Sequence, residues 1–147
     1  MPNIDLKAQL QQFMDTVWNA GDFSTIGDIV SERYTVKHDP GDAWDGQTLD
    51  YNAFKQRVQY SRNAFPDLDF AIQDMVAEAN RVVAFWIMSG THADDLDNFP
   101  ATGKSFAISG ITIYDFDDNA KVCGHTQAYD RLGFLAQVGG LQMLKES

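Results

Sequence analysis

One apolar run, Val82-Val83-Ala84-Phe85-Trp86-Ile87-Met88, indicates the architecture of the chain. Its β-branched and aromatic residues favour a buried strand over a segment of helix. Phe85 and Trp86 are neighbours, so large apolar side chains point to both faces of this strand. Helices can cover one face, and a second subunit is the usual cover for the other. We therefore expect a homodimer.

The segments on both sides of this run also have strand patterns. Strands are expected over residues 68–77, 105–116 and 121–129, and a short one over residues 34–38. Tight turns at Ala79-Asn80 and Asp117-Asp118-Asn119-Ala120 favour antiparallel pairing of the strands that they join. Residues 91–103 are rich in glycine, aspartate and proline and are expected to form a loop.

The first part of the chain has helical patterns instead. Apolar residues recur at steps of three and four from residue 5 to 19, which predicts a helix that ends at Ala20-Gly21-Asp22. A short helix is expected over residues 24–30. A longer one starts at Thr48 or Asp50 and ends before Pro66, and a short closing helix covers residues 131–135. Helices followed by a meandering antiparallel sheet predict one α+β domain over residues 1–147.

Composition excludes several kinds of partner. With 11 basic and 21 acidic side chains the net charge is −10, which argues against nucleic acid and against anionic membrane surfaces. Eighteen of the acidic residues are aspartate, which suits turns and caps. Cys123 is the single cysteine and the first residues are too polar for a signal peptide. No apolar stretch reaches the roughly 18 residues of a membrane span, so we expect a cytoplasmic protein.

No metal site is expected from the spacing of possible ligands. The turn from Asp115 to Asn119 resembles the start of a calcium loop, but Ala120 and Thr126 stand where glycine and a bidentate glutamate belong. The segment Asp94-Asp95-Leu96-Asp97 is interpreted as a solvated loop. The three histidines lie far apart in sequence, and only convergence in space would make them ligands. Taken singly, each is more often structural than catalytic.

Asp130 is the most informative carboxylate in the sequence. It ends a weakly charged strand and precedes an apolar run, 132–138, so burial among apolar groups would raise its pKa towards neutrality. An aspartate directly before a helix is also a good N-cap. The spacing alone leaves both interpretations open.

A set of short motifs runs from residue 19 to residue 139. The motifs are Asn19-Ala20-Gly21-Asp22, residues 34–38 with Asp39-Pro40-Gly41, Arg62-Asn63-Ala64-Phe65-Pro66-Asp67-Leu68, Gly90-Thr91-His92, Pro100-Ala101-Thr102-Gly103-Lys104 with Ser109-Gly110, and Asp130-Arg131-Leu132-Gly133-Phe134-Leu135-Ala136-Gln137-Val138-Gly139. In this order and spacing they resemble the SnoaL-like polyketide cyclase (ester cyclase) family of the nuclear-transport-factor-2-like superfamily.

The resemblance implies a cone, in which a curved antiparallel sheet wraps around helices and encloses an apolar pocket. It also implies dimers or tetramers built on the outer face of the sheet. In this family an aspartate at the position of Asp130 is the general acid/base of an intramolecular aldol ring closure, with no metal and no organic cofactor.

Other site residues follow from that mechanism. His92 and His38 are the expected catalytic assistants of Asp130, because neutral imidazoles can hydrogen-bond a developing oxyanion. The expected ligand-binding side chains are Trp18, Trp44, Phe65, Trp86 and Tyr114. His125 is left out of the catalytic set, since its odd separation from Asp130 along a strand puts the two on opposite faces.

The chain also departs from the family pattern. Gly124 and Thr126 stand where many relatives carry a glutamate and a tryptophan, so substrate identity does not transfer. The leading hypothesis is a cofactor-independent cyclase or lyase that acts on a small apolar, carbonyl-containing molecule. The alternatives are a non-catalytic small-ligand binding protein, another activity of the same fold (isomerase, dehydratase or hydrolase), and a protein-interaction module whose interior is filled by its own side chains.

Overall fold

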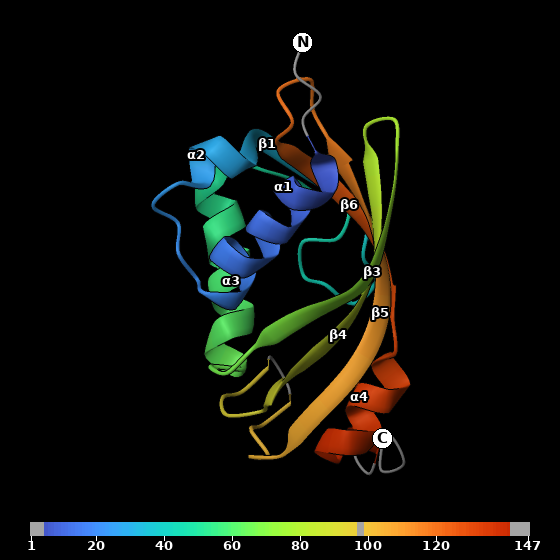
Figure 1. Cartoon of the computed structure of the whole chain (residues 1–147). Helices are drawn as coiled ribbons and strands as arrows, with labels where there is room; N and C mark the ends of the chain where they lie inside the picture. Colours follow the sequence, from blue (N-terminus) through green and yellow to red (C-terminus); the bar gives the residue numbers. More distant parts are fainter. Residues whose placement is uncertain (1–4, 97–98, 142–147) are drawn as a thin grey trace.

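The computed structural model describes residues 5–96 and 99–141 of the 147-residue chain. A single curved sheet of six strands wraps around the first helices (Figure 1). The strands lie in the order β2-β1-β6-β5-β4-β3. Their bounds are β1 Val30–His38, β2 Thr48–Leu49, β3 Asp69–Glu78, β4 Arg81–Thr91, β5 Ser105–Phe116 and β6 Val122–Tyr129. The expected α+β architecture is confirmed.

The helices begin and end where the sequence supplies caps. They are α1 (Leu6–Phe13), which continues as the π-helix η1 (Met14–Asn19), α2 (Ile26–Ile29), α3 (Tyr51–Ala64) and α4 (Arg131–Val138). The Asp5 carboxylate accepts hydrogen bonds at the start of α1, and that of Asp50 accepts one from Ala53 N in α3. Gly21 follows η1 with φ +64°, a left-handed conformation that glycine adopts without strain.

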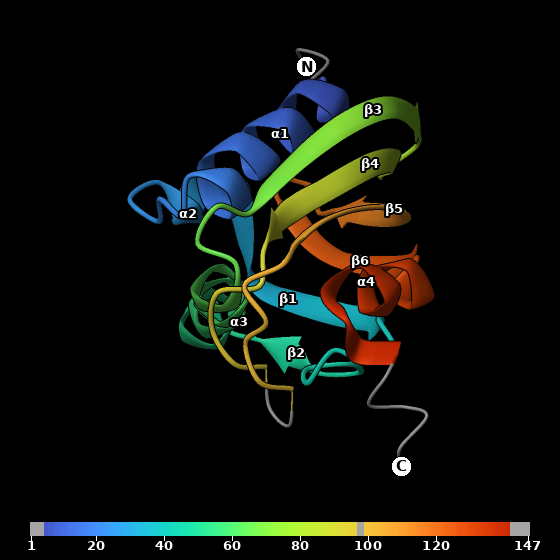
Figure 2. The ribbon, with the colours of Figure 1, turned by 90° about the horizontal axis from the view of Figure 1, so that it is seen from below.

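The N-terminal helices cover the concave face of the sheet. α1 packs against β3 and β4, and α3 packs against β1 and β2, at the two sides of the sheet. Figure 2 shows how the sheet curls from β3 to β2 around these helices. Fully buried side chains from α1 and α3, such as Leu10, Phe13 and Phe54, form the core against the strands. Among the helices of residues 5–96 and 99–141, none is long and apolar enough to cross a membrane.

The alternation expected in the central strand is present. Val82, Ala84 and Trp86 of β4 are buried, whereas Phe85 and Ile87 are 42% and 37% exposed on the outer face. Phe85 pairs with Ile111 of β5, which is 52% exposed. Both faces of the sheet are therefore apolar, as the sequence predicts.

Several details of the fold differ from the sequence predictions. The sheet is not wholly antiparallel, because β1 pairs with β6 in parallel. These strands lie far apart in the chain, so no hairpin turn sets their direction. β1 begins at Val30, which shortens the expected helix over 24–30 to four residues, and β2 was not predicted. The last helix extends to Val138, beyond the expected residue 135.

Candidate active site

A cavity of about 310 Å³ lies between the concave face of the sheet and the N-terminal helices. This volume is at the lower end of the range of small-molecule pockets, roughly 300–1,000 Å³. The five side chains expected to bind a ligand all line it: Trp18, Trp44, Phe65, Trp86 and Tyr114. Contact of these side chains with a ligand stays a prediction, but the structure places all five in the cavity lining.

Close packing places the indole ring of Trp86 across the neighbouring strand. A Cβ atom added to Gly110 of β5 would lie within about 2.3 Å of the ring, closer than atoms of folded proteins approach one another. Glycine at this position therefore leaves the space that the ring occupies. The ring also makes an edge contact with Phe70, with centroids 5.2 Å apart, so its orientation is fixed on two sides.

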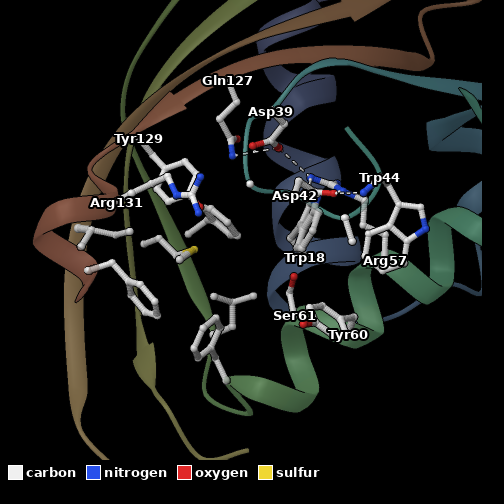
Figure 3. A pocket seen from close by; sticks show the side chains of 18 of the residues that line it. Trp18, Asp39, Asp42, Trp44, Arg57, Tyr60, Ser61, Gln127, Tyr129 and Arg131 are labelled. Carbon is white, nitrogen blue, oxygen red and sulfur yellow. Dashed lines mark hydrogen bonds and ion pairs between the residues drawn. The ribbon is translucent and has the colours of Figure 1, made fainter. Parts of the chain in front are cut away.

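One end of the cavity is polar, and Asp39 lies among the polar side chains at this end (Figure 3). Asp39 follows the last residue of β1 and is only 2% exposed. The turn that follows holds this position, because Asp39 N donates to Asp45 Oδ1 at 2.7 Å and Trp44 N donates to Asp42 Oδ1 at 2.8 Å. The aspartates of the turn thus stabilise its backbone by accepting from backbone amides.

The two oxygens of the Asp39 carboxylate differ in their surroundings. Oδ2 is close to three donors, with His125 Nε2 at 2.8 Å, Arg57 Nη2 at 3.2 Å and Gln127 Nε2 at 3.4 Å. Oδ1 has no hydrogen-bond partner among the residues that the structure describes. Because Asp39 lines the cavity, Oδ1 is the oxygen that a ligand can reach.

Arg57 balances the buried negative charge. It reaches from α3 between two carboxylates and also donates from Nε to Asp42 Oδ2 at 3.0 Å. Burial lowers the pKa of Arg57, but Asp42 and Asp39 outweigh this effect and raise the pKa, so the guanidinium stays charged. Its carbon Cζ lies 5.3 Å from the ring of Trp18, which adds a cation–π contact.

His125 is held in its neutral form. Burial lowers its pKa from the ordinary 6.5; the hydrogen bond to Asp39 opposes the shift, and the charge of Arg57 adds to it. The phenol of Tyr34 lies 2.5 Å from His125 Nδ1, and burial raises the pKa of this phenol well above 10. The Asp39 carboxylate can only accept, so a neutral His125 carries its proton on Nε2 and donates to Asp39, while Nδ1 accepts from the phenol of Tyr34.

The structure places Asp130 outside this site. Asp130 is exposed, and its Oδ1 accepts a hydrogen bond from Gly133 N at 2.8 Å, which caps α4. It does not line the cavity. This position favours the cap interpretation over the catalytic one, because an exposed carboxylate is not desolvated by apolar neighbours.

The two histidines expected to assist Asp130 do not line the cavity either. His38 is exposed at the end of β1. His92 is fully buried, with Nδ1 3.2 Å from Thr102 Oγ1 and the ring of Phe99 packed edge-on at 4.8 Å. Its Nε2 has no partner within the described part of the chain. Residue Asp97, part of the loop predicted at 94–97, lies outside the described residues.

Sequence reasoning missed the polar residues that the structure brings together, namely Asp39, Arg57, His125 and Gln127. The odd separation left His125 out of the expected catalytic set, but the structure places His125 in the cavity lining and Asp130 outside it, after the end of β6. The sequence does contain a signal for Arg57, because this residue falls inside the apolar stripe of α3, between Phe54 and Val58. A charged residue within such a stripe needs a buried partner.

No metal centre is found among residues 5–96 and 99–141, where no three His, Cys, Asp or Glu side chains are grouped suitably for an ion. A buried carboxylate with one accessible oxygen can accept a proton, and the neighbouring donors can stabilise negative charge.

Comparison with known proteins identifies the family. The profile described as SnoaL-like polyketide cyclase matches residues 8–138. A proposed polyketide cyclase from Acidithiobacillus ferrooxidans has 41% sequence identity and a TM-score of 0.84, over 95% of this chain and 98% of that one. No match was found among the curated proteins.

More distant solved structures share the fold. IdmH from Streptomyces antibioticus, a proposed polyketide cyclase, has 22% identity and a TM-score of 0.76, over 92% of this chain and 99% of its own. AclR from Streptomyces galilaeus, a proposed hydroxylase, has 21% identity and a TM-score of 0.73, over 92% and 81% of the two chains. With the profile match over most of its length, this chain belongs to the SnoaL-like polyketide cyclase family.

Proposed function

We propose that the protein is a cofactor-independent acid/base enzyme, a cyclase or lyase, that acts on a small apolar molecule containing carbonyl groups. Asp39 is its general base. One observation carries the proposal: a buried carboxylate has one oxygen held by three donors, while the other faces a cavity with aromatic walls. A carboxylate so placed can take a proton from a bound molecule without competition from bulk water.

The chemistry needs only the groups of this chain. A carbon next to a carbonyl gives its proton to Asp39 Oδ1, and the electron pair of the broken C–H bond becomes the enolate. The enolate carbon then forms a bond to a second carbonyl carbon of the same molecule, whose oxygen becomes an alkoxide and takes the proton back from Asp39. The aromatic walls contribute by holding the two reacting carbons close together.

Two side chains beside Asp39 can stabilise the enolate oxygen. Arg57 stays charged, and its Nη1 has no hydrogen-bond partner among the described residues. Gln127 lines the same end of the cavity and carries a second amide hydrogen besides the one directed at Asp39. Donors in a water-poor site lower the free energy of a developing oxyanion more than they would in bulk water.

A non-catalytic carrier is the main alternative. The same cavity could bind a small ligand without converting it, and a neighbour of the same fold described as a hydroxylase indicates how far activities diverge on it. The hypothesis of an interaction module requires a filled interior, which a cavity of about 310 Å³ does not support.

Proton abstraction can be tested without the natural substrate. A panel of small aryl ketones and aryl β-keto esters is dissolved in D₂O, and exchange of the protons next to the carbonyl is followed by NMR. The proposal predicts that the protein accelerates exchange for at least one member of the panel in a saturable way. Binding of panel members, seen as ligand-induced stabilisation, without any acceleration would overturn the enzymatic proposal in favour of the carrier.

The outer face of the sheet supports a homodimer as part of the proposal. Phe85, Ile87 and Ile111 lie exposed on neighbouring strands and form one apolar surface. Sedimentation at micromolar concentration should give the mass of a dimer or a larger assembly. Ile111→Lys should shift the distribution to monomer, whereas Asn52→Lys, on the exposed side of α3, should not. A wild-type protein that sediments only as a monomer would contradict the prediction.

A further inference from the structure

A chain of hydrogen bonds crosses three strands and ends at Asp39. Trp86 Nε1 of β4 donates to Thr112 Oγ1 of β5 at 2.8 Å, and Thr112 Oγ1 donates to Gln127 Oε1 of β6 at 2.8 Å. Gln127 Nε2 then lies 3.4 Å from Asp39 Oδ2. Thr112 and Gln127 are direct cross-strand partners, and Thr112 is fully buried, so water does not replace these contacts.

The chemistry of the first member fixes the direction of the whole chain. An indole N–H can only donate, so the hydroxyl of Thr112 must accept from Trp86. The single hydrogen of that hydroxyl is then free to donate to an acceptor, and of the two ends of the Gln127 amide only Oε1 can accept it. The NH₂ group of Gln127 therefore faces Asp39, and the carboxylate favours the same orientation, because the reverse one would set Gln127 Oε1 against Asp39 Oδ2, two acceptors with no hydrogen between them.

A second chain reaches the same carboxylate from the other side. Tyr34 donates to His125 Nδ1, and His125 donates from Nε2 to Asp39 Oδ2. That chain contains the titratable imidazole of His125, so the group that donates to Asp39 can change its charge with pH. The chain through Trp86 and Thr112 contains no group that titrates near neutral pH, so its direction does not depend on pH.

We propose that Thr112, with Trp86, is a positioning residue of the acid/base site, which locks the amide of Gln127 with its N–H groups towards Asp39. The lock keeps an N–H donor directed at Asp39 Oδ2. The inference rests on the proposed function in naming Asp39 as the base. The orientation of Gln127 itself does not depend on whether the protein is an enzyme.

Other charged and titratable groups face Asp39 and remain when Thr112 is changed. They are Arg57 from α3, Asp42 and Asp45 from the turn after β1, Tyr34 from β1, Tyr114 from β5, and His125 and Tyr129 from β6. A change in the pKa of Asp39 between Thr112 variants therefore reports the amide rather than these groups.

The test compares Thr112→Val with Thr112→Ser in the full chain. Valine keeps the shape of threonine but removes the hydroxyl, whereas serine keeps the hydroxyl. The pKa of Asp39 is measured by ¹³C NMR titration of its carboxyl carbon, which is assigned by its loss in Asp39→Asn. With valine, Gln127 Oε1 loses its donor, so the amide is held less firmly with its N–H groups at Asp39, and we expect the pKa of Asp39 to rise by up to about one pH unit as this donor weakens. With serine the pKa of Asp39 should stay within about 0.3 pH units of the wild-type value.

A second variant protects the test against a folding defect. Trp86→Phe keeps an aromatic ring but removes the indole N–H that orients the Thr112 hydroxyl towards Gln127, so the amide should be held less firmly and the pKa of Asp39 should rise here too. Thr35→Val, whose hydroxyl contacts Thr48 on the surface, is the control and should leave the pKa of Asp39 unchanged. An unchanged pKa of Asp39 in both Thr112→Val and Trp86→Phe would overturn the inference, as would an equal rise in Thr112→Ser.

Failure of this inference is distinguishable from failure of the proposed function. If the pKa of Asp39 rises as expected while the wild-type protein exchanges no ketone protons, the positioning role stands and the enzymatic proposal falls. If exchange occurs and the pKa of Asp39 is the same in every variant, the positioning role falls and the general base stands.

Discussion

Two aspartates end neighbouring strands and have opposite surroundings. Asp39 follows β1 and Asp130 follows β6, and these strands pair in parallel, so both residues leave the sheet at the same edge. Asp39 turns inward and contacts the side chains of α3 and β6. Asp130 turns outward and accepts from the backbone of the helix that follows it.

Residue type does not separate the two carboxylates: the direction of the side chain at the strand end makes one of them buried and the other a helix cap. The inward aspartate has to be compensated by Arg57, because a buried unpaired charge is strongly unfavourable. The outward aspartate is compensated by water and by the unsatisfied amides of α4. Variants on the two sides should therefore differ in both the size and the kind of their effects.

Arg57→Met should have the largest effect on stability. It removes the cation that contacts both Asp39 and Asp42 and leaves the buried carboxylate of Asp39 without this partner. Breaking a buried ion pair on one side costs about 3–5 kcal/mol of unfolding free energy, which urea denaturation can measure. Arg33→Met, the matched change at an exposed arginine of β1, should cost less than about 1 kcal/mol. Equal losses of unfolding free energy in the two variants would contradict the special role of the buried arginine.

Asp130→Ala should have a smaller effect that differs in kind. It removes the acceptor of the Gly133 amide and should cost about 1 kcal/mol through loss of the cap. Asp130→Asn keeps an acceptor oxygen and should cost only a few tenths of a kcal/mol. Amide hydrogen exchange in α4 should quicken in the alanine variant alone. Equal destabilisation by alanine and asparagine would show that the charge, and not the cap, matters.

The smallest effect is expected from pH. The pKa of His125 is lower in the folded state than its ordinary 6.5, so the unfolded chain binds the proton more readily. Unfolding free energy should therefore fall as the pH is lowered from about 7 to 5. The fall should be shallower in His125→Gln, which has no imidazole to protonate. Parallel wild-type and variant profiles over this range would contradict the neutral state assigned to His125.

Much of the fold could be predicted because its signals are local. The apolar run 82–88, the turn at 79–80 and the cap at Asp50 each act over a few residues, and all three are present in the structure. The aromatic walls were predictable for a related reason, since large side chains on the concave face of a curved sheet come close together. The parallel pairing of β1 with β6 could not be predicted, because it joins segments some 90 residues apart with no turn to set it.

The polar centre of the site was harder to predict than its walls. Asp39 stands in a turn with Asp42 and Asp45, and all three have the same sequence pattern as solvated turn residues. Burial and the contact with His125, in addition to Arg57, distinguish Asp39, and these pairings span 86 and 18 positions. Asp130, in contrast, has a strong local signal for a cap, and the structure has the cap.

One measurement tests most directly whether the base is Asp39. The rate of α-proton exchange of the best ketone probe in D₂O is compared between Asp39→Asn and Asp130→Asn, with folding of both checked by near-ultraviolet circular dichroism. The account predicts that Asp39→Asn loses acceleration by about 100-fold or more, the usual contribution of a general base, while Asp130→Asn stays within about threefold of wild type. Full acceleration in Asp39→Asn together with its loss in Asp130→Asn would contradict the account.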